Sequence, residues 1–323
     1  MATTTDRYIN PFTDFGFKKL FGSEMNKDLL MAFLNTLLPP KAGTITNLTF
    51  MPNECIGRSE FDRRAIFDLH CKNERNEYFI VEIQRAKQDY FKDRSVYYAS
   101  FPIQEQAQRG EWNFKLAPVY MVGILDFTFD DTDNDVYHLV QLTDQATGKR
   151  FFDKLSFIYL ELPKFTKTVD ELTNDFEKWC YVFKHLPYLT DRPARLQEKV
   201  FLKVFELAEI AKYTTEEAHE YEKSLKVYRD LKNVIDCAYG EGKAEGLEEG
   251  KEIGVLEGME KGMEIGVLEG MEKGMEIGVL EGMEKGKEIG VLEGRLDVAR
   301  RLVAGGMSKD EAAVFAGVDV EIL

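Results

Sequence analysis

The chain has 323 residues, of which 44% are hydrophobic and 12% aromatic, which is enough for one substantial packed domain and excludes a wholly disordered protein. Its formal net charge of −15 is the opposite of what a nucleic-acid binder needs, because phosphate contacts require Lys and Arg. Residues 241–294 alone hold 15 glutamates against 6 lysines, a net charge of −9, so the acidic average says little about residues 1–240.

The spacing of the cysteines and the sequence of the N-terminus indicate in which cellular compartment the protein is expected. The four cysteines are far apart and form neither a CxxC pair nor a Cys/His cluster at metal-ligand spacing. The N-terminus lacks a basic region followed by an apolar run, and the longest apolar stretch, residues 29–38, is too short to span a bilayer. We therefore expect a cytoplasmic protein with no membrane partner. Motifs for ATP binding and for serine hydrolysis do not occur.

Residues 11–38 and the runs that follow predict a helix and a group of strands. Apolar residues recur at helical spacing up to a double proline, which ends the helix. Runs rich in β-forming residues occupy 44–50, 64–71 and 78–84. Because residues 72–77 are polar and contain turn formers, the last two runs are expected to pair as an antiparallel hairpin.

The next elements complete a predicted α/β domain. Residues 88–109 have the spacing of a long helix, residues 116–125 are an almost fully apolar run typical of a strand buried on both faces, and residues 156–162 predict another strand. Together they predict a mixed central sheet flanked by helices over residues 8–165. A helical extension follows over residues 166–240, with predicted core residues Trp179, Phe183, Leu186, Phe201, Val204, Phe205 and Leu207.

The sequence changes abruptly after residue 240. A 12-residue unit, EIGVLEGMEKGM, is repeated within residues 241–294, and glycine occupies every fourth position from Gly242 to Gly294, 14 times in all. Relative to alanine, so many helical glycines cost roughly 14 kcal/mol, about the whole folding stability of a typical domain. An isolated helix is therefore expected to be unstable here. The segment is either a helical element that assembles chains or a flexible acidic linker.

The spacing of the glycines favours the first alternative. Glycine at every fourth position lets helix backbones approach closely, and these glycines form a stripe along the helix. Because 4 exceeds the 3.6 residues of a helical turn, the stripe winds around the helix by about 40° from one glycine to the next. This geometry favours a right-handed crossing with a partner helix and predicts a homo-oligomer. Residues 295–323 then predict a short C-terminal helical hairpin, broken at Gly305 and Gly306, with Ser308 capping its second helix.

The predicted hairpin contains the candidate catalytic residues. Asp68 lies in an otherwise apolar run, and Glu82 and Gln84 share one face of the next strand. A turn near Arg75 places Asp68 opposite Glu82, where two carboxylates about 5 Å apart repel by roughly 3 kcal/mol at an effective dielectric of 20. A hard divalent ion, Mg²⁺ or alternatively Mn²⁺ or Ca²⁺, held by Asp68, Glu82 and the carbonyl of Ile83, would relieve the repulsion.

Such an ion can acidify a bound water and polarise a phosphate, which is the task of a hydrolytic nuclease. The alternative is that Glu and Gln alternate here only because they form the solvated face of a strand. Spacing alone leaves both possibilities open.

A family resemblance favours the nuclease. Residues 67–69, 79–84, 91–94 and 97–100 resemble the Rpn family of recombination-promoting nucleases and transposase-related proteins, in the PD-(D/E)xK superfamily. The similarity covers roughly residues 8–295, including the glycine-periodic tail. The resemblance implies a restriction-endonuclease-like core and a metal-dependent DNA endonuclease of low sequence specificity, acting in recombination, mobile-element biology or defence. The competing hypothesis is a non-catalytic interaction protein that keeps the nuclease fold and assembles through its tail.

The resemblance also implies site residues. Asp68 and Glu82 match the metal-binding acidic pair, and Gln84 occupies the position where most of the superfamily has lysine. Glutamine supplies only a neutral donor and acceptor, so it is expected to orient a water without contributing charge. Asp14 matches the N-terminal acidic position, as a further metal or water ligand; alternatively it is only a favourable charge at a helix N-terminus.

Substrate contacts are expected from the helix that follows the hairpin. Phe91, Arg94 and Tyr98 share one helical face, where Arg94 suits a phosphate and Tyr98 suits stacking or hydrogen bonding. The alternative is an interfacial aromatic face with a snorkelling arginine. Lys18 adds positive charge near the site, as do Lys19, Arg85 and Lys87.

Overall fold

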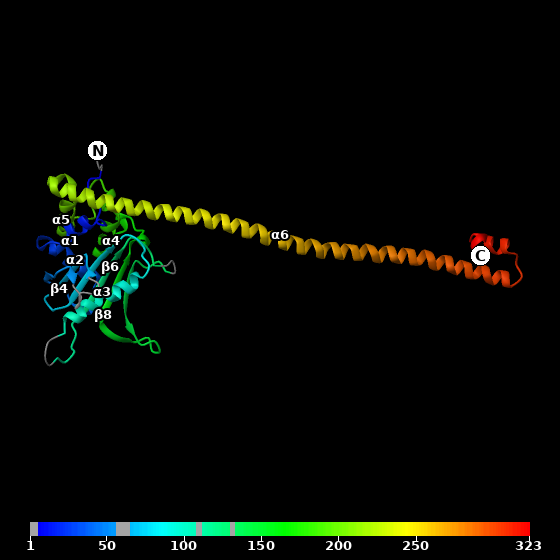
Figure 1. The fold of residues 1–323 in the computed structure, drawn as a ribbon, viewed down its shortest axis with the longest axis horizontal. Coiled ribbons are helices and arrows are strands. Elements are labelled where there is room, and N and C mark those ends of the chain that lie inside the picture. Colours follow the sequence, from blue (N-terminus) through cyan, green and yellow to red (C-terminus); the bar gives the residue numbers. More distant parts are fainter. Residues whose placement is uncertain (1–5, 56–64, 108–111, 130–132) are drawn as a thin grey trace. The chain divides into compact units, whose positions relative to one another are not determined.

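The computed structural model describes residues 6–55, 65–107, 112–129 and 133–323 (Figure 1). The chain divides into two compact units between Ala238 and Tyr239. The first unit contains both β-sheets and helices α1 to α5. The second contains most of helix α6 and the C-terminal elements.

The centre of the first unit is a six-stranded mixed sheet with the order β1-β4-β5-β6-β8-β7. β5 pairs antiparallel with β4 and parallel with β6, β8 is parallel to β6, and β1 and β7 add antiparallel edges. The strands are β1 (Leu48–Phe50), β4 (Leu69–Asn73), β5 (Tyr78–Gln84), β6 (Val119–Leu125), β7 (Tyr137–Thr143) and β8 (Arg150–Glu161), with β2 (Glu54–Cys55) and β3 (Ala65–Ile66) in a separate two-stranded sheet. The predicted mixed sheet and its hairpin are confirmed; β7 was not predicted.

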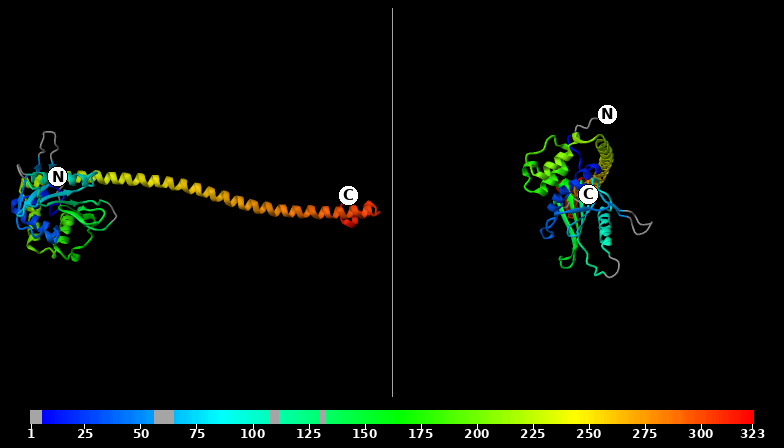
Figure 2. Two further views of the ribbon diagram at one scale, coloured as in Figure 1. Left: turned by 90° about the horizontal axis from the view of Figure 1, so that it is seen from below. Right: turned by 90° about the vertical axis from the view of Figure 1, so that its left-hand side faces the viewer.

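Helices cover both faces of the large sheet (Figures 1 and 2). Four of them cover one face: α1 (Asp14–Phe21), α2 (Lys27–Leu37), α4 (Asp175–His185) and α5 (Lys199–Ala208). Phe79 of β5 belongs to the core on that side. Helix α3 (Phe91–Glu105) covers the other face, and Ile80 of β5 belongs to the core on that side. Because strand residues alternate between faces, Glu82 and Gln84 lie on the face that α3 covers.

The helical extension packs as its apolar spacing predicts. Six of its seven predicted core residues are buried, and Leu207 is partly buried against them. Helix α3 begins later than predicted, at Phe91, because Tyr90 has a φ of 63°, outside the helical region. It ends at Glu105, whereas residues 108 and 109 of the predicted helix lie outside the described residues.

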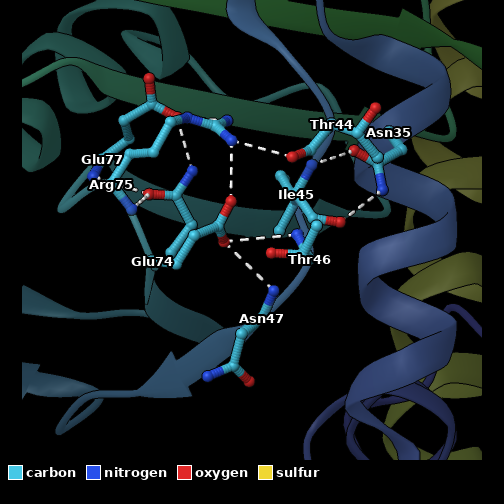
Figure 3. Close-up of polar contacts among 9 residues, drawn as sticks. Asn35, Thr44, Ile45, Thr46, Asn47, Glu74, Arg75 and Glu77 are labelled. Atoms are coloured by element: carbon cyan, nitrogen blue, oxygen red, sulfur yellow. Dashed lines mark hydrogen bonds and ion pairs between the residues drawn. The ribbon is translucent and has the colours of Figure 1, made fainter.

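The turn between β4 and β5 is fixed by polar side chains (Figure 3). Asn73 Oδ1 accepts from the backbone N–H groups of Arg75 (3.0 Å) and Glu77 (2.9 Å). The Arg75 guanidinium binds Glu77 (2.8 Å) and donates to the carbonyl of Thr44 (2.8 Å). Glu74 accepts from backbone N–H groups at residues 46 and 47. These contacts join the turn to the segment before β1 and hold the register of the hairpin.

The predicted strand over residues 64–71 is not continuous, which corrects the sequence-based expectation. Residue 64 lies outside the described residues, β3 ends at Ile66, and β4 begins at Leu69, so Asp68 lies in a break. Both residues in the break form hydrogen bonds with Asn53. The N–H of Phe67 donates to the carbonyl of Asn53 (2.8 Å), and the side-chain amide of Asn53 donates to the carbonyl of Asp68 (3.0 Å). These bonds replace strand pairing and free the Asp68 side chain to turn toward β5.

Helix α1 is held in place by a close backbone approach at Gly16. Thr13 caps the helix by accepting from the Gly16 N–H (3.0 Å), and its hydroxyl donates to the carbonyl of Asn10 (2.7 Å). A Cβ at Gly16 would lie 2.2 Å from that carbonyl oxygen.

Gly16→Ala is therefore expected to lower the free energy of unfolding of the first unit by about 3 kcal/mol or more, since a backbone oxygen cannot yield as a side chain can. Urea unfolding followed by tryptophan fluorescence measures it. Gly240→Ala is a control outside the glycine repeats, because its added Cβ meets nothing within 4 Å. Equal stability of the two variants would contradict the expectation.

Helix α6 (Thr215–Ala304) is continuous and includes all the 12-residue repeats. Its first turns belong to the first unit: the hydroxyl of Tyr221 accepts from the N–H of Asn10 (2.9 Å), and that of Ser224 accepts from the N–H of Phe15 (3.1 Å). That the repeats assemble chains remains a prediction. None of the described helices combines the length and the apolarity needed to cross a membrane.

The end of the second unit is a small helical hairpin. Helix α7 (Lys309–Ala316) follows α6, and Ser308 and Glu311 form a capping box at its start. Ala299 of α6 is buried, as are two alanines of α7.

Candidate active site

Asp68 and Glu82 meet at the start of β4 and the end of β5. The register pairs Leu69 with Val81, so Asp68 lies opposite Glu82. The backbone N–H of Asp68 donates to Glu82 Oε1 (3.1 Å), and the N–H of Ile83 donates to Asp68 Oδ2 (2.8 Å). Glu82 is only 5% exposed. The hairpin thus places two acidic side chains side by side in a poorly solvated position.

The environment of this pair disfavours two negative charges. Burial, followed by the charge of Asp68, raises the pKa of Glu82 to about 8. Burial also raises the pKa of Asp68, against the hydrogen bond from Ile83 that lowers it. A nearby cation would favour the ionised form of both groups.

The donor atoms suit a hard divalent ion. Carboxylate oxygens are the ligands that Mg²⁺ and Mn²⁺ prefer, and both ions accept water and phosphate oxygens in the remaining positions. Among the described residues no group of three or more His, Cys, Asp or Glu side chains could hold a metal. The pair would therefore need ligands of other kinds, and the carbonyl of Ile83 remains a prediction for one of them.

Gln84 and Arg94 are brought into contact beside the pair. Arg94 Nη2 donates to Gln84 Oε1 (2.6 Å), and its Nη1 donates to Gln88 Oε1 (2.6 Å). The Arg94 guanidinium lies 5.0 Å from the ring centroid of Phe91 and 5.7 Å from that of Tyr98. The helical face deduced from the sequence therefore lies over the strand face that carries Gln84.

Asp14 and Lys18 lie on α1 at the border of the site. They form an ion pair with each other (2.8 Å), and each is about half exposed. The charge of Asp14 raises the pKa of Asp68 and that of Lys18 lowers it, after the larger effects of burial and hydrogen bonding. Both residues thus influence Asp68 through space, and Lys18 is partly neutralised by its partner.

A surface depression of about 440 Å³ lies beside α1, and α6 forms part of its wall. Its lining residues are Asp14, Phe15, Lys18, Lys19, Arg85, Glu220, Lys223, Ser224 and Val227. The Arg85 guanidinium lies over the ring of Tyr228 (5.4 Å), and burial lowers its pKa. The α6 residues of this wall were not predicted, since nothing in a helical stretch some 140 residues further along the chain marks them as neighbours of the hairpin.

Asp126 is another neighbour that sequence analysis missed. It follows β6, and its N–H donates to the carbonyl of Gln84 (2.9 Å), so it lies at the same edge of the sheet. Only the parallel register of β5 and β6, which the sequence does not reveal, places it there.

Comparison with known proteins identifies the family of the chain. The family model of the PD-(D/E)XK nuclease family transposases matches residues 11–238, which include both acidic residues, Gln84, and α3. No curated protein and no solved structure matches the chain. The matched segment covers well over half of the chain, and it bears out both the superfamily resemblance of the sequence and the expected α/β core. The protein therefore belongs to the PD-(D/E)XK nuclease family transposases.

Proposed function

We propose that the protein is a divalent-metal-dependent DNA endonuclease of low sequence specificity, acting in DNA recombination, mobile-element biology or defence. The main support is the pair Asp68 and Glu82: a half-buried and a buried acid on facing positions of the hairpin, with the backbone N–H of Asp68 donating to Glu82 and a pKa of about 8 for Glu82. A buried acidic pair weakens a fold unless it serves a ligand, and perturbed carboxylates cluster at functional sites.

Each residue of the site has a proposed role. Asp68 and Glu82 would hold the ion, with the carbonyl of Ile83 as a further ligand, and the chemistry that a bound divalent ion supplies is acidification of water and polarisation of phosphate. The Ile83 N–H keeps the Asp68 carboxylate oriented (2.8 Å). Asp14 and Lys18 border the site, where Lys18 suits a phosphate of the DNA backbone.

Low specificity follows from the contacts that the site can offer. Tyr98 and the cationic side chains suit stacking and phosphate binding, and neither depends on base sequence. DNA is proposed as the substrate, and the cytoplasm as the place of action, from the family resemblance and from the expectations drawn from the sequence.

The test is cleavage of supercoiled plasmid by the full-length protein with Mg²⁺, Mn²⁺ or Ca²⁺, with EDTA as control. We expect nicked and linear products with Mg²⁺ or Mn²⁺ and intact plasmid with EDTA. A matched RNA transcript, assayed in parallel, separates a DNA nuclease from an RNA nuclease. Absence of cleavage with every ion would favour the competing hypothesis, a non-catalytic interaction protein with a nuclease fold.

We also propose that the protein is a homo-oligomer assembled through the repeats of α6. Large apolar side chains such as Ile253, Leu256 and Met259 are exposed along the helix. Exposed apolar surface on this scale is typical of an interaction surface.

A further inference from the structure

Gln84 is held in place through both of its polar atoms. Its Oε1 accepts a short hydrogen bond from Arg94 Nη2 (2.6 Å), and its Nε2 donates to the carbonyl of Ala86 (3.3 Å). A hydrogen bond from a charged donor is roughly twice as strong as a neutral one, so a water would compete poorly with Arg94 for this position on Oε1. That Gln84 orients a water stays a prediction, and its contact with Arg94 indicates a second role.

Arg94, in contrast, has hydrogen-bonding capacity that its neighbours do not use. Its Nε is buried and without a hydrogen-bond partner. Among the described residues no carboxylate lies within ion-pair distance of its guanidinium; both amide partners, Gln84 and Gln88, are neutral. A buried donor without a partner on a charged group is costly, so it calls for a functional explanation such as a bound water, an ion or a catalytic role.

The position of Arg94 is also fixed on several sides. Its guanidinium contacts the rings of Phe91 and Tyr98, one turn before and one turn after it on α3. The two glutamine oxygens hold its terminal nitrogens. Its charge acts on Glu82, whose carboxyl borders the site of hydrolysis. A cation held this firmly needs little reorganisation when a reacting group gains negative charge.

We propose that Arg94 is a catalytic residue that contacts a non-bridging oxygen of the scissile phosphate, and that Gln84 is the positioning residue that holds it there. This inference rests on the proposed nuclease function. Arg94 stays protonated throughout: it donates hydrogen bonds to the phosphate as charge builds up on the oxygens, and it takes up no proton. The side chain on α3 thereby supplies the positive charge that Gln84 on β5 cannot.

The test is a double-mutant cycle on a fluorescent DNA duplex at saturating Mn²⁺. Arg94→Met is expected to lower kcat by about 100-fold or more with a smaller change in KM, because the contact strengthens as charge develops. Arg94→Lys should recover at least about tenfold. Gln84→Met should lower kcat about tenfold in the wild-type background and have little further effect in the Arg94→Met background, because Gln84 acts through Arg94.

A rescue experiment sharpens the test. In the double variant Gln84→Lys with Arg94→Met, a lysine on β5 replaces the lost charge, and we expect kcat at least about tenfold above that of Arg94→Met. Lys92→Met, which removes an exposed charge two residues away on α3, is the control and should stay within about threefold of wild type. Mn²⁺ affinity, measured by calorimetry, should not fall in Arg94→Met, since removing a cation does not weaken a nearby cation site.

The results separate the inference from the function on which it rests. Independent, multiplicative effects of the Gln84 and Arg94 substitutions, an effect of Arg94→Met on KM alone, or a loss of Mn²⁺ binding would each overturn the inference. If the wild-type protein cleaves DNA and Asp68→Asn abolishes cleavage, yet Arg94→Met cleaves normally, only the inference fails. If the wild-type protein cleaves nothing, the nuclease function itself fails. Should Arg94→Met not fold, Arg94→Lys and Gln84→Met still decide.

Discussion

Asp68→Asn and Glu82→Gln are each expected to lower plasmid cleavage on the order of 10³-fold while leaving the fold intact. Each removes one of two anionic oxygen donors, and an ion held by a single carboxylate at millimolar concentration is bound weakly and poorly oriented. Cleavage time courses at several Mn²⁺ concentrations measure the effect. Asp89→Asn, an exposed acid in the loop before α3, is the matched control. Cleavage by the two site variants at the wild-type rate would remove the pair from catalysis.

The same substitutions are expected to stabilise the metal-free protein. The folded-state pKa of Glu82, about 8, lies above the ordinary carboxyl value of 4.5, so its contribution to stability is complete below about pH 4.5 and is lost as the pH rises through 8. In EDTA the melting temperature of the wild type should therefore fall toward pH 8, whereas that of Glu82→Gln should not.

Divalent ions should reverse the order of thermal stability of the wild type and Glu82→Gln. Mn²⁺ binds the folded wild-type site and not the unfolded chain, so it should raise the melting temperature of the wild type and have little effect on Glu82→Gln. Equal thermal shifts in both proteins would mean that the ion binds elsewhere.

The hairpin could be predicted from the sequence because the interactions that form it are local. β4, its turn and β5 are contiguous, so the alternation of side chains and the position of the turn suffice to place Asp68 opposite Glu82. The break before β4 was missed because it depends on Asn53, whose contacts with residues 67 and 68 bridge a separate segment of the chain.

The elements and contacts that escaped prediction depend on tertiary context. β7 is an edge strand with half-exposed and exposed residues, so it lacks the apolar run that marks β6. Helical spacing brought Arg94 to the correct face of α3, but residue type and spacing do not reveal which atoms a side chain binds. The hydrogen bond from Arg94 to Gln84 depends on how α3 packs over β5, which the sequence does not reveal.

Replacement of Gly254, Gly258 and Gly262 by alanine is expected to stabilise helix α6 and at the same time to abolish self-association. In the single chain an added Cβ at any of these positions meets nothing within 4 Å. Each substitution should thus favour the helix by about 1 kcal/mol. If the glycines form the contact face between two helices, the same methyl groups fill the space that the partner backbone needs, and the oligomer dissociates.

The choice of adjacent glycines follows from the winding of the stripe. At about 40° per step, the stripe circles the helix once in roughly 36 residues, so two straight helices can share it only over a short crossing. Successive glycines therefore belong to one contact, and three substitutions there remove it. Glu257→Ala, between two of these glycines, is the matched control, because glutamate and alanine have similar helix propensities.

Light scattering gives the mass of the assembly, and far-ultraviolet circular dichroism gives the helix content. Retained helix content with a fall in mass supports assembly through the glycines. Retained helix content with an unchanged mass would place the contact on the apolar side chains instead. A monomeric wild-type protein whose helix content rises steeply in the triple variant would favour the flexible linker, because a pre-formed helix has little helix content left to gain.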